Sequence, residues 1–469
     1  MQYSIVNYKT VKENSDFRID AEYYHPIYLV IHEKIKSKNN VLFFSKIKKI
    51  SSGKNLPQID NGKYKFIRTQ NIRPILIDDS GMSETDNVNN LKLLKKGDML
   101  FVRVGEGVGN SSIVTENYSK NAFSDNILKL EIKEINPFFC SVFFNSTIGQ
   151  TYFKRVFKGT ARSLISQENF KDIFIPVFND FFQNLIQSLI EKSQEFIEKS
   201  KSLYSQAEQL LLSELELLNW KPKHELAFVK NFSATRQAER FDAEYFQPKY
   251  EEIMESVRKY KDVFDELGNL VQIKKSIEPG SEAYQENGIP FVRVSNLSKF
   301  ELSDNNQQFI SEKLYDELKI YQPKKDEILL SKDATPGIAY YLNEEPKQMI
   351  VSGGILRLKI LSQKILPEYL TLALNSVIVQ KQIERDVGGS VINHWRPEQV
   401  KLTIIPILEN AKQKEIKELI EKSFFDRKQS KSLLEIAKRG VEIAIEKSEE
   451  EAENWINYNL TELKKLKNI

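Results

Sequence analysis

Cysteine and histidine are scarce in this chain of 469 residues. There is one cysteine, Cys140, and the four histidines lie far apart, at His25, His32, His224 and His394. A single cysteine excludes a disulfide framework and is typical of a reducing cytosol. Because the histidines are scattered, a clustered Cys/His metal site is not expected either.

Long apolar runs and a secretory signal are missing too. No apolar run reaches about 18 residues, and the first residues, MQYS, lack a basic-then-apolar pattern. The 68 basic and 65 acidic residues leave a net charge of only +3, so any polyanion site must be a local patch. We expect a cytoplasmic, multi-domain protein that makes no membrane contact.

The sequence contains one pattern twice. The nine residues RIDAEYYHP, which begin at Arg18, return 222 positions later as RFDAEYFQP, which begins at Arg240. Further echoes follow in the same order, up to LIEKS at Leu189 and again at Leu419. Small loop insertions explain why the offset grows to 230. A repeat of this length predicts a duplicated domain and not a solenoid.

Each copy predicts the same succession of parts. A short helix opens at Pro26 or Pro248, where the missing amide hydrogen costs nothing. A long polar-apolar helix ends each copy, with Asp180 and Asn410 as the expected caps. Short β-like runs lie between them, at 63–69, 99–104, 126–132, 291–294, 327–330 and 354–360.

These parts predict an α+β protein with a mixed α/β domain in each copy. Residues 1–179 form the first short helix and domain, and 180–220 the first long helix. Residues 221–409 form the second domain, and 410–469 the second long helix, expected over about 411–458, with a tail. The acidic run 446–453 is interpreted as a solvated face of that helix.

The two long helices share a heptad pattern. Apolar residues recur at every seventh position from Phe182 to Leu217, and a column of Ser and Ala follows the same step. Small residues let a second helix approach closely, while the apolar column seals the contact. The expected packing residues are Ser193, Phe196, Ser200, Leu203, Ala207, Leu210, Ser423, Ser430, Leu434, Ala437 and Ala444.

We therefore expect an antiparallel coiled coil within the chain, relating the two domains by a pseudo-two-fold axis. The alternative is two independent amphipathic helices, each lying on its own domain. The shared column of small residues argues against this alternative, because a helix that lies on a globular domain does not need matched Ser and Ala.

Polar residues occur in two regions of each copy where a strand or a glycine-containing loop could present them. One region follows the strand at 63–69 or 291–294, and Arg, Asn and Gln there are the side chains that contact guanine and adenine edges. The other comprises the loops 158–163 and 388–396, where glycine permits close backbone approach. The candidate DNA-binding residues are Arg68, Gln70, Asn71, Arg73, Arg103, Lys158, Arg162, Ser163, Arg293, Ser295, Asn296, Lys332, Asn393, His394 and Arg396.

For any one of these residues, an ordinary polar loop is the simpler interpretation. For the set, the duplication favours recognition, because the flanks repeat while the polar residues between them differ. That is the pattern of one scaffold that holds two different recognition surfaces.

Two motifs suggest chemistry but have structural explanations. The sequence NPFF from Asn136 resembles the catalytic loop of DNA adenine methyltransferases, but it lacks the second proline and a glycine-rich cofactor loop, so a proline-opened helix is favoured. Residues 105–109, GEGVG, are interpreted as a turn between strands. No Ser/His/Asp triad, Walker loop or nuclease cluster stands out, so no catalytic residue is predicted.

The order of these parts resembles the specificity subunit (S, HsdS) of type I restriction-modification enzymes. The resemblance is carried by the two nine-residue openings, the strand GDMLF at 97–101, the Ile-Pro pairs at 175 and 405, and the two long helices. The second copy departs from the pattern at 325–328, where KDEI replaces KGDM, which leaves the geometry of that turn open.

The resemblance implies two target recognition domains, each followed by a spacer helix. It also implies binding to double-stranded DNA, docking of two DNA methyltransferase subunits, and a restriction/translocase subunit that joins them. S-adenosylmethionine would then bind the methyltransferase, and this chain would hold no cofactor and no catalytic site. Three alternatives stay open: the recognition subunit of a type IIB system, a DNA adenine methyltransferase, and a coiled-coil scaffold.

Overall fold

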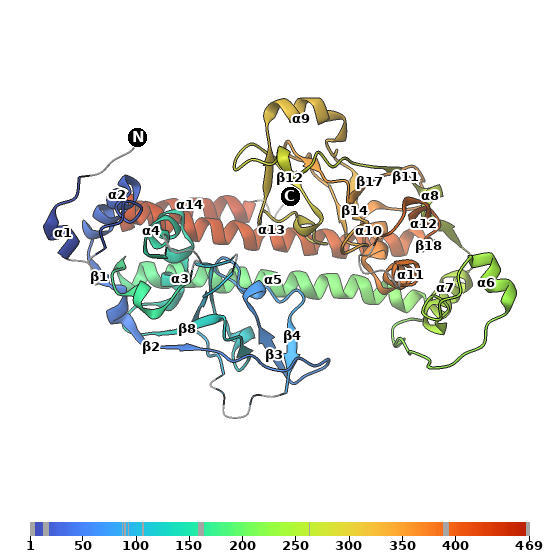
Figure 1. Ribbon diagram of the computed structural model, residues 1–469, viewed down its shortest axis with the longest axis horizontal. Helices are drawn as coiled ribbons and strands as arrows, with labels where there is room; N and C mark the ends of the chain where they lie inside the picture. The colour runs from blue at the N-terminus through green and yellow to red at the C-terminus, as the bar shows by residue number, and fades with distance from the viewer. Residues whose placement is uncertain are drawn as a thin grey trace. The chain divides into compact units, whose positions relative to one another are not determined.

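Figure 1 shows the chain as a computed structural model. It describes residues 5–12, 18–86, 88, 91, 93–105, 107–157, 164–261, 263–387 and 394–465. The chain divides into two compact units. Unit 1 comprises Met1–Glu198 and Asp426–Ile469, and unit 2 comprises Lys199–Phe425.

Unit 1 contains three small sheets, with strand orders β2-β8-β5-β6, β4-β3-β7 and β1-β9. Its strands are β1 (Asn40–Leu42), β2 (Ile47–Ser52), β3 (Tyr64–Ile67), β4 (Ser83–Thr85), β5 (Met99–Val102), β6 (Ser111–Ile113), β7 (Ala122–Phe123), β8 (Ile127–Ile132) and β9 (Phe174–Pro176). Its shorter helices are α1 (Tyr8–Lys12), α2 (Pro26–Lys36), α3 (Pro137–Asn145) and α4 (Thr147–Phe157). A phenylalanine-rich core, which includes Phe101 and Phe144, lies between the four-stranded sheet and helices α3 and α4.

Unit 2 repeats these sheets, with strand orders β11-β17-β14-β15, β13-β12-β16 and β10-β18. Its strands are β10 (Phe264–Glu266), β11 (Val271–Lys274), β12 (Ile289–Val292), β13 (Gln308–Ile310), β14 (Glu327–Ser331), β15 (Ala339–Tyr341), β16 (Ile350–Val351), β17 (Ile355–Ile360) and β18 (Ile404–Pro406). Its shorter helices are α6 (Phe232–Ala238), α7 (Pro248–Lys259), α8 (Leu267–Leu270), α9 (Glu312–Leu318), α10 (Pro367–Asn375), α11 (Val377–Val387) and α12 (Pro397–Lys401).

The two units share their topology, including the one parallel strand pair in each three-stranded sheet. β3 pairs with β7 in parallel, and β12 pairs with β16 in parallel. Every other pair of neighbouring strands in these sheets is antiparallel. The duplication seen in the sequence is therefore a duplication of the fold.

The repeated nine-residue motif makes the same contacts in each unit. Arg18 pairs with Asp20 at 2.8 Å and donates to the backbone oxygen of Val156, near the end of α4. Arg240 pairs with Asp242 at 2.7 Å and donates to the backbone oxygen of Asp386, near the end of α11. The motif thus holds the helix that leads into each predicted recognition loop, at 158–163 or 388–396.

The long helices α5 (Asp180–Glu214) and α13 (Asn410–Glu446) are each unbroken (Figure 1). Within unit 1, the hydroxyl oxygens of Ser193 and Ser430 lie 2.7 Å apart. Within unit 2, the hydroxyl oxygens of Ser200 and Ser423 lie 2.9 Å apart. Residue numbers rise along one helix as they fall along the other, so the helices pack antiparallel inside each unit.

The packing surface differs in detail from the expected one. The small residues Ser193, Ser200, Ala207, Ser423, Ser430, Ala437 and Ala444 are buried. The apolar residues Phe196, Leu203, Leu210 and Leu434 are only partly buried. Close approach at the small residues places the larger side chains at the margins of the contact. In unit 1, α5 also packs against the rest of the unit, since Phe182 and Ile186 belong to the unit 1 core.

The second long helix ends earlier than the sequence pattern predicted. α13 stops at Glu446, and a separate helix α14 (Glu449–Lys465) follows. Ser448 explains the break, because its hydroxyl accepts from the backbone N–H of Glu451 at 3.2 Å and three glutamates in the first turn favour a helix start there. The acidic run is therefore a helix N-terminus and not one solvated helix face.

The caps of the long helices also lie one residue earlier than predicted. Asp180 and Asn410 are the first helical residues. The side chain of Asn179 accepts from the backbone N–H of Phe182 at 2.8 Å and so caps α5.

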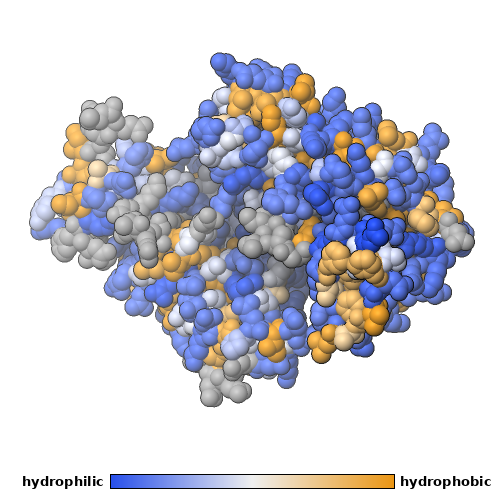
Figure 2. Space-filling view, turned by 45° about the vertical axis from the view of Figure 1, so that its right-hand side comes forward, coloured by the Kyte–Doolittle hydropathy of each residue, from blue (hydrophilic) through white to orange (hydrophobic). Residues whose placement is uncertain are grey.

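α14 packs back against α13 inside unit 1. A β-carbon added at Gly440 of α13 would lie 2.6 Å from Cδ1 of Ile456, which is fully buried on α14. A larger residue at this position would require the Ile456 side chain to shift. Among the described residues, no helix is both long and apolar enough to cross a membrane, and the face in Figure 2 is mostly hydrophilic with separate apolar patches.

Candidate nucleic-acid interface

Three segments of unit 1 meet at the ends of strands β3 and β5. The backbone N–H of Ser124 donates to Ile67 at 2.9 Å, and that of Arg103 donates to Asn126 at 2.9 Å. The backbone N–H of Ile165 then donates to Arg103 at 3.0 Å. These bonds bring Arg68 and Arg103 to the edge where the chain returns from residues 158–163.

Unit 2 builds the same edge with equivalent bonds. Ser352 donates to Val292 at 2.8 Å, Lys332 donates to Gly354 at 2.9 Å, and Trp395 donates to Lys332 at 2.8 Å, all between backbone atoms. Arg293 and Lys332 therefore occupy the places of Arg68 and Arg103. The structure brings together residues that the sequence placed in separate regions.

The arginine and asparagine after each first strand hold the loop. The Asn71 side chain accepts from the backbone N–H of Arg68 at 3.0 Å and donates to the backbone oxygen of Asp78 at 2.9 Å. Asn296 makes the same contacts with Arg293, at 3.1 Å, and with Ser303, also at 3.1 Å. Both asparagines are buried. This corrects the expectation that they present free amides to adenine.

Arg68 and Arg293 are also tied to the loop that they open. Nη2 of Arg293 donates to the backbone oxygen of Asn306 at 2.8 Å, and Nη2 of Arg68 lies 3.4 Å from the backbone oxygen of Gly81. Between each arginine and its asparagine, Gln70 in unit 1 and Ser295 in unit 2 are exposed. The divergent positions are the exposed ones, as expected for residues that contact a ligand.

Arg73 and Arg103 are half-buried on the same edge of unit 1. Arg73 lies 3.7 Å from Asp78, with about 39% of each side chain exposed. Nε of Arg103 is buried without a hydrogen bond to any described residue. Neither guanidinium group is locked into the fold in the way that Arg293 is.

Unit 2 carries a linked set of charged groups at this edge. Asp333 accepts from Lys332 and lies 2.8 Å from Nδ1 of His394. Burial alone would raise the pKa of Asp333, but the hydrogen bonds from Lys332 and His394 hold that pKa below its usual value. The carboxylate is therefore ionised at neutral pH and orients the Lys332 ammonium group and the His394 ring.

Arg396 has a structural contact as well. It precedes α12, and its backbone N–H donates to Oε1 of Gln399 at 3.0 Å. Nε of its exposed guanidinium group donates to the same oxygen at 3.3 Å. Lys158, Arg162, Ser163 and Asn393 lie outside the described residues, so their places at this edge stay predictions.

Each four-stranded sheet contains a buried charged pair, which the sequence analysis missed. Lys129 on β8 lies 3.1 Å from Asp98 and 3.0 Å from Glu131, and 2% of the Lys129 side chain is exposed. In unit 2, Glu327 lies 2.8 Å from Lys274 and 4.0 Å from Arg357. The repeated sequence contains a signal for this pair. In both copies an acidic residue at the start of one strand, Asp98 or Glu327, is matched by a basic residue on the neighbouring strand of the sheet, Lys129 or Arg357.

The turn before β14 keeps the geometry of the first copy despite its different sequence. Asp326 adopts φ +67°, and Gly97 in the equivalent turn adopts φ +88°. The Asp326 side chain accepts from the Tyr341 hydroxyl at 2.9 Å. This hydrogen bond offsets part of the strain of a left-handed backbone at a non-glycine residue.

The two motifs that suggested chemistry are structural. Asn136 caps α3, since its side chain accepts from the backbone N–H of Phe138 at 2.9 Å and donates to Gln187 at 2.7 Å. The glycines at 105 and 109 have positive φ and lie in the connection between the antiparallel strands β5 and β6. Among the described residues, no three His, Cys, Asp or Glu side chains form a metal-binding group.

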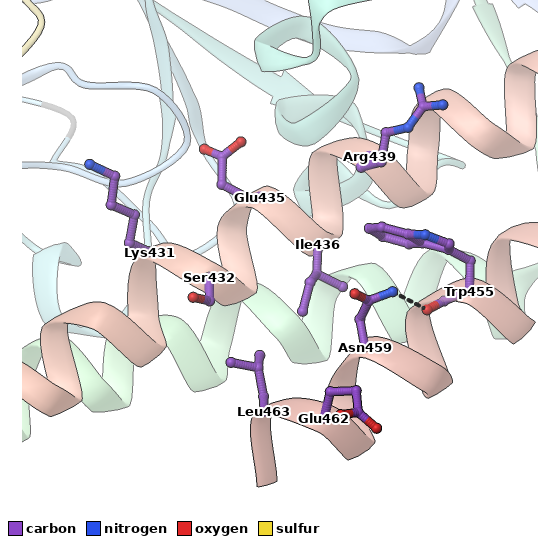
Figure 3. Close-up of a pocket in the computed structure, with 9 residues that line it drawn as sticks. All are labelled: Lys431, Ser432, Glu435, Ile436, Arg439, Trp455, Asn459, Glu462 and Leu463. Atoms are coloured by element: carbon purple, nitrogen blue, oxygen red, sulfur yellow. Dashed lines mark hydrogen bonds between the residues drawn. The ribbon is translucent and has the colours of Figure 1, made fainter. Parts of the chain in front are cut away.

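A separate groove of about 540 Å³ lies between α13 and α14 in unit 1 (Figure 3). Ile436, Trp455 and Leu463 form its apolar part, while Glu435 and Arg439 stand at its edge. Its described lining contains no cysteine or histidine. The groove combines an apolar floor with charged residues at its edge.

Residues 255–434 match the family model described as the type I restriction modification DNA specificity domain. This part of the chain is such a domain. For these residues, the match confirms the type I restriction-modification specificity domain that the sequence predicted. The match covers most of unit 2, and the shared topology extends the same fold to unit 1.

Several solved structures are similar at low sequence identity. The type I restriction-modification S subunit from M. genitalium is 14% identical, with a TM-score of 0.39, over 87% of this chain and 94% of that one. The HsdS subunit from Thermoanaerobacter tengcongensis is 12% identical, with a TM-score of 0.27, over 87% and 97%. The type IIG restriction endonuclease BpuSI is 9% identical, with a TM-score of 0.30, over 74% and 44%.

Likenesses at these identities and TM-scores assign no target, partner or residue role to this chain. No curated protein matches the sequence. The specificity domain is thus established by the family match, and the uses of its surface are argued from the residues themselves.

Proposed function

We propose that this chain recognises a bipartite, asymmetric DNA sequence, one half with each unit. The observation that supports this most directly is the equivalent edge in both units, which pairs identical backbone bonds with different side chains. Identical bonds give both edges one docking geometry, and different side chains give them different base preferences. Arg103 and Lys332 supply positive charge for phosphates, while exposed polar residues such as Gln70 contact base edges.

The long helices would set the gap between the two half-sites. The serine pairs Ser193–Ser430 and Ser200–Ser423 fix the register of the helices inside each unit. If the helices cannot slide past each other, the helix pair keeps one length, and one length favours one spacing between half-sites.

Methylation and cleavage would come from partner proteins, and this chain would hold no cofactor. The second class of function, a DNA adenine methyltransferase, needs a free Asn136 side chain to bind the target base. That side chain is committed to capping α3 and to Gln187. We propose that two methyltransferase subunits and a restriction/translocase subunit assemble on the chain in the cytoplasm, and the groove between α13 and α14 is a suitable docking surface.

The test is selection of bound sequences from a randomised duplex library by the purified full chain, with and without its methyltransferase partner. The expected product is two short sequences separated by a constant gap, and neither should be the inverted repeat of the other. Binding should weaken steeply with salt, as phosphate contacts require. Enrichment of one continuous or palindromic sequence, or of none, would contradict the proposal.

A second experiment tests the helix length. Deleting residues 194–200 together with 423–429 removes the Ser200–Ser423 layer and keeps the Ser193–Ser430 register. Seven helical residues span about 10.5 Å, which corresponds to about three base pairs. The gap in the selected site should shorten accordingly, whereas deleting 194–200 alone shifts the register and serves as the control. An unchanged gap would remove the helices from the role of spacer.

A further inference from the structure

In each unit, one residue pair bridges two chain segments at the candidate interface, and the side chains of this pair differ between the units. An isolated antiparallel bridge joins Val104 to Leu164 in unit 1 and Asp333 to His394 in unit 2. Each bridge directly follows the equivalent bonds from Ile165 to Arg103 and from Trp395 to Lys332. The two pairs therefore stand at the same place in the fold.

The pair in unit 1 is apolar and accessible. Val104 is 38% exposed and Leu164 is 44% exposed, although both lie on an edge that otherwise carries Arg68 and Arg103. Scaffold contacts at other positions repeat in both units, as with Arg18–Asp20 and Arg240–Asp242. An accessible apolar pair that is not repeated is better explained by what it contacts than by the stability of the fold.

The pair in unit 2 is polar, and the contact with Asp333 orients the His394 ring. A carboxylate only accepts hydrogen bonds, so the 2.8 Å contact from Asp333 places the proton of a neutral His394 ring on Nδ1. Nε2 is then an acceptor, and 63% of the His394 side chain is exposed. The ring therefore presents one defined acceptor to the solvent.

We propose that these bridge pairs are specificity-determining residues, with Val104 and Leu164 contacting a thymine methyl group and His394 accepting from an exocyclic amino group of adenine or cytosine. Asp333 is a positioning residue that acts through His394. In the major groove only thymine offers a methyl group, and only adenine and cytosine offer an amino donor. This proposal rests on the proposed function, since it assigns chemistry to the surface that contacts DNA.

The first test begins with the DNA sequence that the wild-type chain selects. Each thymine is replaced in turn by deoxyuridine, which lacks the methyl group, and the dissociation constant is measured with the full chain. One position in one half-site should weaken binding about three- to tenfold, the size expected for one buried methyl group. In the Val104→Ala/Leu164→Ala double variant the same replacement should have no effect.

The second test concerns His394. His394→Gln keeps an acceptor at a similar distance, whereas His394→Phe keeps the ring size and removes the acceptor. Asp333→Asn loses the carboxylate that fixes the proton on Nδ1. His394→Phe and Asp333→Asn should relax the preference at one base pair of the other half-site about fivefold or more, and His394→Gln should retain most of it.

The outcomes separate the two proposals. If the wild-type chain selects a bipartite site but no deoxyuridine replacement weakens binding and the His394 variants keep their preference, the bridge pairs are not specificity determinants. If the wild-type chain selects no site, the proposed function itself fails. Unchanged circular dichroism and thermal unfolding of the variants would show that a lost preference is not a loss of fold.

Discussion

The buried lysine of unit 1 offers the sharpest prediction for stability. Lys129 lies on β8, between β2 and β5, and its ammonium group lies 3.1 Å from Asp98, a side chain that is 6% exposed. In Lys129→Met the methionine fills a similar volume, but Asp98 stays buried without its cation. Removing one partner of a buried pair costs about 3 to 5 kcal/mol, so unit 1 should lose stability by this amount at neutral pH.

The pH dependence of the loss follows from Asp98. Burial already raises the pKa of this carboxyl group, despite the hydrogen bonds from Lys95 and Lys129. Without Lys129 the pKa should rise further, and the folded protein then binds a proton more readily than the unfolded chain. The deficit is present in full above the raised pKa and shrinks as pH falls through it toward the unfolded value. A neutral carboxyl group no longer needs the cation.

The assay is urea unfolding at several pH values, combined with hydrogen exchange of peptides that cover β5 and β8. Exchange in β14 and β17 of unit 2 is the internal reference. The Asp98→Asn/Lys129→Met double variant is the matched control, because it leaves no ionised carboxylate buried at position 98 and should be more stable than the single variant. A single-variant loss below about 1 kcal/mol, or a loss that does not depend on pH, would refute the role assigned to the pair.

Two further predictions concern packing. Gly440→Ala should loosen the packing of α14, because its new β-carbon forces the Ile456 side chain to shift. Faster hydrogen exchange over residues 449–465 is expected, the Ile456→Ala background should restore protection, and unchanged exchange would contradict the close approach. Asn296→Ala should unfold the loop after β12 and lower the free energy of unfolding by about 1 to 3 kcal/mol, since it leaves buried backbone groups unpaired. Ser295→Ala is the control and should leave stability unchanged, so equal stability of the two variants in urea would contradict the structural role of Asn296.

The sequence predicted those parts of the fold that local physics decides. Proline at the first turn placed α2, α3 and α7 correctly, because proline fixes φ and needs no donor there. The break between α13 and α14 was missed although its signal was present. Ser448 followed by Glu451 is a serine-x-x-glutamate start, and the acidic composition hid it inside an apparently continuous polar helix.

Within the candidate site, residues that repeat in both copies differ in role from residues that do not. Arg and Asn occur in both copies, at 68 and 71 and again at 293 and 296, and the structure uses both pairs to hold a loop. Residues that stay the same while their neighbours differ between the two copies are explained by the scaffold. The sequence predicts Asn71 and Asn296 as DNA contacts because asparagine suits adenine, a chemical argument that takes no account of burial.

The same reasoning identifies residues that the sequence could not have selected. Val104 and Leu164 are apolar, so a search for polar DNA contacts passes over them, and only the bridge that joins them shows that they occupy the places of Asp333 and His394. Pairing across 60 residues of chain is decided by sheet topology, which the local pattern does not specify. A duplicated recognition protein therefore contains its own control: at each place where the backbone is equivalent and the side chains differ, exchanging the two residue pairs isolates the contribution of chemistry to specificity.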